Sequence, residues 1–277
     1  MKSILLPVEP NSTIDAALTI ADLLAGRFGS HVEGVALVPR IVNYVGDDVI
    51  VTLPELQYSE AERTIAAREL FDAFRASRTT DKEADAVAKK RFRWSDRAAI
   101  DDDALAWLAR VYDLTVVGRP GLRRSEPRRT TLESALFEGG CPVMMAPPTS
   151  PKSLGTNIAI HWNASTEMAR AIRAALPLLN QAERVTLVSV EGNMSSGLKI
   201  ADMTDYLELH GIRATHTHVR PSGKTSGGQT LLSEVARIGA DLLIKGAYTQ
   251  SRLRQMVFGG VTQHVLEAAE IPVLLSH

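Results

Sequence analysis

Glycines near the end of the chain stand where a helix could bind a phosphate. An apolar strand pattern ends at Gly246, and Gly259 and Gly260 then precede a helical pattern that begins at Val261. Glycines at a helix start let the backbone approach a phosphate, which free amide hydrogens and the helix dipole attract. Thr262 adds a hydroxyl group. The pattern fits an anion site, but the same glycines also suit tight turns in a packed α/β unit, which is their commoner use.

Common catalytic patterns are missing from the sequence. The loop after Gly246 contains no Gly-Lys-Ser/Thr and no tight glycine triplet, so the P-loop and the dinucleotide fingerprint are excluded there. No Ser/His/Asp or Cys/His pattern indicates a nucleophile. His216 and His218 alternate along one predicted strand, but no third ligand has suitable spacing, so we favour a polar strand face and predict no metal site. His161 either stacks on a base or packs at a strand end.

The chain repeats one pattern of strands and helices. Residues 3–12 resemble residues 157–165, and each copy continues with an apolar helical pattern. Ser12 and Ser165 are the expected helix N-caps, with Asp15 completing a capping box in the first copy. Further matching pairs follow in the same order: 32–38 with 185–190, 113–121 with 241–249, and 142–146 with 272–276. The strands are near-continuous Val/Ile/Leu runs, which is typical of parallel strands buried on both faces.

This order predicts an α/β fold, with two domains that each contain a five-stranded parallel sheet and flanking helices. Pro147 to Leu154 has the composition of a linker, so we place the domains at 1–148 and 155–277. The first copy carries about 25 extra residues within 40–88, including an expected long helix from about 59 to 77. Helices are also expected over 99–112 and 229–238.

Composition describes an ordinary soluble chain. It has 277 residues, 45% of them hydrophobic, with 31 Lys+Arg against 32 Asp+Glu, so no global charge favours nucleic acid or membrane lipid. The single cysteine, Cys141, excludes an internal disulfide framework. No apolar run reaches the length of a membrane helix, and the N-terminal run is shorter than a signal-peptide core. We therefore expect a cytoplasmic protein.

The glycine spacing resembles the nucleotide loop of universal stress proteins, which reads Gly, two residues, Gly, nine residues, Gly, Ser/Thr. Here the positions are Gly246, Thr249, Gly259 and Gly260, so a threonine replaces the second glycine and a glycine replaces the Ser/Thr. With the duplicated strand order, the chain resembles a tandem member of that family. The resemblance implies two Rossmann-like domains of the adenine nucleotide alpha hydrolase type.

The resemblance also implies where a nucleotide would bind in the second copy. Adenine and ribose would lie near Asn163, where relatives have aspartate, and near Val190. The phosphates would lie on the helix-start segment and the loop before it, at Gly246, Thr249, Gly259, Gly260, Val261 and Thr262. A β-branched Thr249 narrows this loop or opposes a positive φ there. The implied ligand is ATP or AMP, with Mg²⁺ an option alongside ATP.

The first copy departs further from the family pattern. Pro7, Glu9, Gly118 and Gly121 match its start, but Arg129 stands where the helix-start glycine belongs, followed by Thr130. A bulky side chain there should obstruct a phosphate. Residues 119–129 hold five arginines and one acid. One interpretation is an anion site; the other, which we favour, is a solvated loop whose charge is screened.

The expected function is an adenine-nucleotide-binding stress-response module without efficient turnover. The alternatives are a ligand-free scaffold for an unidentified protein partner, with residues 40–88 as its working surface, and a slow nucleotide hydrolase. Tandem relatives pair their last strands, here 142–146 and 272–276, which implies an intrachain pseudo-dimer and leaves a further homodimer open. Such pairing would cover two apolar strand edges.

Overall fold

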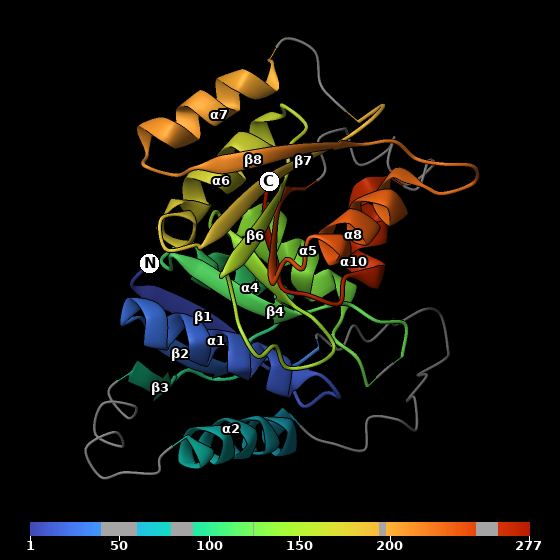
Figure 1. Cartoon of the computed structure of the whole chain (residues 1–277). Helices are drawn as coiled ribbons and strands as arrows, with labels where there is room; N and C mark the ends of the chain where they lie inside the picture. Colours follow the sequence, from blue (N-terminus) through green and yellow to red (C-terminus); the bar gives the residue numbers. More distant parts are fainter. Residues whose placement is uncertain (40–59, 79–90, 124, 194–197, 248–259) are drawn as a thin grey trace.

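One sheet runs through the whole molecule (Figure 1). The computed structural model describes residues 1–39, 60–78, 91–123, 125–193, 198–247 and 260–277. The strands are β1 (Ser3–Val8), β2 (His31–Ala36), β3 (Phe92–Trp94), β4 (Leu114–Gly118), β5 (Val143–Ala146), β6 (Asn157–His161), β7 (Arg184–Val190), β8 (Ala214–Val219), β9 (Leu242–Gly246) and β10 (Val273–Ser276). The helices are α1 (Ile14–Phe28), α2 (Glu60–Ser77), α4 (Asp102–Ala109), α5 (Arg129–Glu138), α6 (Thr166–Leu179), α7 (Ile200–Leu209), α8 (Gly227–Arg237) and α10 (Val261–Ala268).

The sheet order is β3-β2-β1-β4-β5-β10-β9-β6-β7-β8, so each half of the chain contributes five neighbouring strands in the same arrangement. Within each half all pairs are parallel: β1 lies between β2 and β4, and β6 lies between β7 and β9. The halves meet where β5 and β10 pair antiparallel, with Met144 opposite Leu274. The predicted α/β fold and the predicted pairing of the last strands are therefore confirmed.

Helices cover both faces of the sheet. Strands β1, β4, β6 and β9 are almost wholly buried, which explains why their sequences do not alternate between apolar and polar residues. One core layer joins the sheet to α1, α2, α6 and α7. The other joins it to α4, α5, α8 and α10. None of the helices in the described ranges is both long and apolar enough to cross a membrane.

Side-chain hydrogen bonds shape the turns from β1 into α1 and from β6 into α6. Ser165 caps α6 as predicted, because its Oγ accepts a hydrogen bond from the Met168 amide at 3.1 Å. The predicted Ser12 cap is wrong: α1 begins after Thr13, and the Ser12 hydroxyl instead donates to the carbonyl of Ser125 at 3.0 Å. Asn11 holds this turn by accepting the Thr13 amide at 3.0 Å.

The insertion contributes a helix to one end of the sheet. The expected helix over 59–77 is α2, and its Phe71 is fully buried, against Gly34 of β2, where a side chain would collide with the ring. Residues 40–59 and 79–88 of the insertion lie outside the described residues. The helix expected over 99–112 is shorter than predicted, because Asp101 caps it by accepting the Ala104 amide at 2.9 Å.

Two arginines of the N-terminal half also bond to residues that follow β5 in the chain. Arg27 of α1 donates to the carbonyl oxygens of Leu154 and Gln181, at 2.6 and 2.7 Å. Arg119, which follows β4, donates to the carbonyl of Ala269 and pairs with the Glu270 carboxylate, both at 3.0 Å. Side-chain contacts therefore reinforce the strand pairing that joins the two halves.

Candidate functional site

Strand order reverses once in each half, between β1 and β4 and between β6 and β9. Ligands of open parallel sheets bind outside the carboxyl ends of the strands at such a point. Pro7, Glu9 and Gly118 lie there in the N-terminal half. The two ends differ chemically, so each is described by itself.

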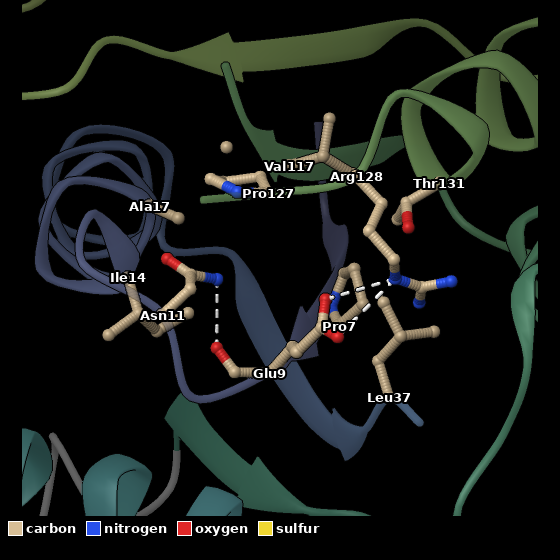
Figure 2. Close-up of a pocket in the computed structure, with 11 residues that line it drawn as sticks. Pro7, Glu9, Asn11, Ile14, Ala17, Leu37, Val117, Pro127, Arg128 and Thr131 are labelled. Carbon is tan, nitrogen blue, oxygen red and sulfur yellow. Dashed lines mark hydrogen bonds and ion pairs between the residues drawn. The ribbon is translucent and has the colours of Figure 1, made fainter. Parts of the chain in front are cut away.

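The N-terminal half has a small cavity at this place, shown in Figure 2. Its lining includes three predicted residues, Pro7, Glu9 and Gly118, together with Asn11 and Arg128. Its volume is about 20 Å³, which holds a water molecule or two. Two other predicted residues, Gly121 and Thr130, do not line it. As it stands, the cavity is far too small for a nucleoside.

Arg128 fills the space that a phosphate would need. It is the N-cap residue of α5, and its guanidinium lies 3.3 Å from Glu9 Oε1 and 2.8 Å from Asp102 Oδ2. Asp102 also accepts hydrogen bonds from the hydroxyls of Thr130 and Thr131, each at 2.7 Å. Burial raises the pKa of Glu9, and the Arg128 charge opposes that rise. This ion-pair cluster occupies the α5 tip with groups from three parts of the chain.

The obstructing side chain is thus one residue earlier than expected. Arg129 begins α5 and pairs with Glu133 at 2.9 Å, while Arg128 stands at the cap. The favoured interpretation of a solvated arginine loop is wrong for Arg119 and Arg128, whose side chains are 18% and 25% exposed and ion-paired. Their charges are committed to carboxylates within the protein.

Replacing Arg128 should destabilise the N-terminal half. Arg128→Met leaves the Glu9 and Asp102 carboxylates close together without their cation. We expect the free energy of unfolding to fall by about 1–3 kcal/mol, which is less than for a fully buried ion pair because these side chains are partly exposed. Urea unfolding with a probe in that half measures it. Adding Glu9→Gln and Asp102→Asn should recover much of the loss. An Arg128→Met variant as stable as the wild type would contradict the role given to the cluster.

In the C-terminal half a lysine lies buried at the end of the fourth strand of that half. Lys245 of β9 is 2% exposed, and its Nζ donates to the Gly246 carbonyl and to Thr262 Oγ1, both at 2.8 Å. Burial lowers the pKa of Lys245 from 10.5 to about 7. Thr262 belongs to the first turn of α10, so the lysine lies directly beneath that turn. The cation and the helix start therefore share one place.

His161 lies at the end of the neighbouring strand β6. It is fully enclosed, and neither ring nitrogen has a hydrogen-bond partner among the described residues. Burial lowers its pKa well below the ordinary value, and the nearby Lys245 lowers it further. Of the two interpretations offered for this residue, the structure supports packing at a strand end. His161 is therefore held as a neutral imidazole.

Among the described residues, the start of α10 is open where the start of α5 is blocked. Gly260 is its N-cap, with φ −70° and ψ 169°, and a Cβ added there meets no atom of the described residues within 4 Å. Val261 follows as the first helical residue and is partly exposed. Two other predicted loop residues, Thr249 and Gly259, lie outside the described residues. The accessible part of the predicted phosphate site is thus Gly260 and Val261, with Thr262 behind them.

The remaining predicted residues surround this end of the sheet. Asn163 is buried after β6, and its Oδ1 accepts the Ser165 amide at 3.2 Å, which shapes the turn into α6. Val190 ends β7 and is fully buried. Gly246 ends β9 against the first turn of α6, where a Cβ would lie 2.5 Å from the Met168 amide nitrogen. Close helix packing by itself explains why glycine stands at 246.

Part of the sequence matches a known protein family. The sequence model of the universal stress protein family matches residues 167–277. Residues 167–277 form a universal stress protein domain by this match. No curated protein matches the sequence.

Three solved structures, two of them named universal stress proteins, are similar along the whole chain. One from Archaeoglobus fulgidus DSM 4304 has a TM-score of 0.71 and 14% identity, covering 99% of this chain and 97% of its own. A putative one from Pseudomonas aeruginosa UCBPP-PA14 has a TM-score of 0.57 and 16% identity, covering 100% and 93%. A functionally unknown protein from P. aeruginosa PAO1 has a TM-score of 0.57 and 15% identity, covering 100% of this chain and 92% of its own. This coverage agrees with a tandem arrangement of two universal stress protein units.

Sequence reasoning missed the most unusual residue of the universal stress protein half. Lys245 interrupts the apolar run Leu-Leu-Ile-Lys-Gly, and a charged residue inside a strand buried on both faces was the available signal. The polar strand face expected at His216 and His218 is confirmed, because both are exposed on strand β8 and both bond to Ser189 Oγ at 3.0 Å. Within the described residues no group of three metal-ligating side chains comes together.

Proposed function

We propose that the C-terminal half binds an adenine nucleotide, with its phosphates at the start of α10, and that the protein is a cytoplasmic stress-response module that does not turn the nucleotide over efficiently. We also infer two domains, 1–148 and 155–277, because each half has its own five strands in the same order. The observation that carries the proposal is the open Gly260 cap, beside a family-matched helix start.

Contrast between the two helix starts supports assigning the ligand to one half. Both α5 and α10 follow the fourth strand of their half, so their first turns occupy equivalent places in the fold. The α5 cap is Arg128 with two carboxylates around it, and these would repel a phosphate. The α10 cap is Gly260, with a hydroxyl and an amine beneath it. Free amides at a helix start are a natural phosphate site.

The experiment places an arginine at the N-cap of α10, as Arg128 stands at the N-cap of α5. In the wild type, ATP or AMP at a hundredfold excess over Kd should stabilise the native state by about 2.7 kcal/mol, which is seen as a rise in Tm. Gly260→Arg places at α10 the residue that caps α5. Because the site is open and φ is −70°, the variant should fold normally and lose the nucleotide-dependent rise in Tm.

Gly26→Arg is the matched control, because this glycine is exposed on α1 and an added Cβ there also meets no atom within 4 Å. It adds the same charge far from α10 and should keep the full nucleotide effect. If Gly260→Arg responds to nucleotide as the wild type does, the phosphates do not bind at α10. A wild type that is unaffected by millimolar ATP and AMP would end the proposal.

A further inference from the structure

Lys245 is a buried amine that pairs with no carboxylate among the described residues. Its recorded partners are a carbonyl oxygen and the Thr262 hydroxyl, and none of the ion pairs among the described residues includes it. A buried ammonium without an opposite charge is strongly disfavoured, so such a residue normally has a partner or loses its proton. The protein keeps this amine although a neutral side chain would fit the strand at lower cost. A ligand that supplies the missing negative charge explains its presence.

The start of α8 lies against the start of α10, whose Thr262 bonds to this amine. Residues at the start of α8 pack on α10: a Cβ at Gly227 would lie 3.1 Å from Val261 Cγ2, and one at Gly228 would lie 2.5 Å from His264 Cβ. Both helices therefore direct their positive ends toward the same end of the sheet. Ser226 and Gln229 satisfy the first amides of α8 through a capping box, whereas Gly260 has no side chain to cap α10. An anion is favoured at the uncapped start.

The titratable groups on the surrounding elements do not supply that anion. On β6 the neighbour is His161, enclosed and unpartnered, and on α10 it is His264. On α8, Glu234 accepts hydrogen bonds from Nε and Nη2 of Arg237, each at 2.7 Å. After β10, His277 bonds to the Ala247 carbonyl at 3.1 Å. Glu267 of α10 is exposed and accepts a hydrogen bond from Gln263, and Glu167 of α6 accepts the Thr166 hydroxyl at 3.0 Å. None of these acids has a recorded bond to Lys245, and the histidines add no negative charge.

We propose that Lys245 is the cation that recognises the ligand's phosphate at the start of α10, and that it takes up one proton from solvent when the phosphate binds. The inference rests on the proposed function and adds to it the residue that supplies the positive charge and the pH dependence of binding. The step forms one N–H bond on Nζ and breaks none in the ligand. Thr262 connects the two parts, because its hydroxyl accepts from Nζ and its backbone lies in the first turn.

Proton uptake follows from the protonation equilibrium of the Lys245 amine. Because burial holds the pKa of Lys245 near 7, the free protein is a mixture of amine and ammonium at neutral pH. A bound phosphate stabilises the ammonium and raises that pKa. Affinity for a phosphorylated ligand should then fall as pH rises above 7, because the proton becomes harder to obtain. An unphosphorylated nucleoside should show no such dependence.

The test compares ADP with adenosine by calorimetry at pH 7 and pH 9, above the last ionisation of the phosphate near 6. For the wild type, ADP affinity should fall about tenfold across this range, with proton uptake visible as a dependence of the heat on the buffer. Adenosine affinity should not change. Lys245→Met and Lys245→Gln should bind ADP about tenfold more weakly at pH 7 and lose the pH dependence; the glutamine keeps a hydrogen-bond donor without the charge.

The outcomes separate the two claims. If ADP binds the wild type equally at both pH values, or binds Lys245→Met as tightly as the wild type, Lys245 is not the phosphate cation, and nucleotide binding itself still stands. If neither ADP nor adenosine binds, both the proposed function and this inference are wrong. If Lys245→Gln alone retains tight, pH-independent binding, a hydrogen bond rather than a charge is what the site uses, and the proton-uptake proposal is overturned.

Discussion

Lys245→Met is expected to be more stable than the wild type at pH 7, by about 1–3 kcal/mol. The fall in the pKa of Lys245 from 10.5 to about 7 corresponds to a penalty of about 5 kcal/mol for the ammonium form. Losing the hydrogen bonds to Gly246 and Thr262 offsets part of the gain, at about 1 kcal/mol each. Methionine fits the straight, buried space that the lysine side chain occupies.

The sign of the pH dependence is definite. Between pH 7 and 10 the unfolded chain binds a proton at this lysine that the folded chain does not, so wild-type stability rises with pH through this window. Below pH 7 the penalty is fully present. The difference between Lys245→Met and the wild type should therefore shrink steadily from pH 7 to 9.5. Taking the difference removes the contributions of Cys141 and Tyr112, which titrate in both proteins.

Urea unfolding without ligand, at several pH values, gives these free energies. Lys152→Met is the control, because Lys152 is exposed and its replacement should change stability little at any pH in this range. A Lys245→Met variant that is less stable than the wild type at pH 7 would show that the amine is stabilising in the free protein. The argument that a ligand explains its retention would then lose its basis.

Gly246→Ala should destabilise the protein by about 3 kcal/mol or more. The added Cβ would lie 2.5 Å from the Met168 amide nitrogen and 2.8 Å from the Glu167 carbonyl carbon, both backbone atoms in the first turn of α6. Backbone cannot rotate aside as a side-chain end can, so β9 and α6 must separate. That movement would also disturb the Ser165 cap and the Asn163 turn.

Thermal and urea unfolding measure the effect, and Gly26→Ala is the matched control. At Gly26, inside α1, an added methyl meets no atom within 4 Å, so that variant should be more stable by about 0.5–1 kcal/mol. A Gly246→Ala variant with wild-type stability would show that the helix and strand are not packed as closely as described. The glycine would then need a ligand-based explanation.

Much of the fold was predictable because it depends on local patterns that occur twice. Buried strands appear as unbroken Val/Ile/Leu runs, and their repeated order fixes the parallel arrangement in each half. The Ser165 cap was predictable for the same reason, since its partner Met168 is three residues away. Ser12 has the same local pattern, but a contact with Ser125, far along the chain, determines its hydrogen bond instead.

The candidate site was harder to predict, because its decisive contacts join distant residues. Arg128 meets Glu9 and Asp102 only through folding, so a sequence of arginines gives no sign of which one is paired. The bond from Lys245 to Thr262 spans a segment outside the described residues. The roles assigned to Thr249 and Gly259 stay predictions.

Antiparallel pairing between β5 and β10 has a consequence for how this molecule comes apart. Those short strands lie at the centre of one hydrogen-bonded sheet. Unfolding of either half therefore exposes the edge strand of the other half. The hydrogen bonds of Arg27 and Arg119 add further contacts between the two halves. The two halves should therefore unfold together, and a nucleotide that stabilises one half should raise the unfolding free energy of both.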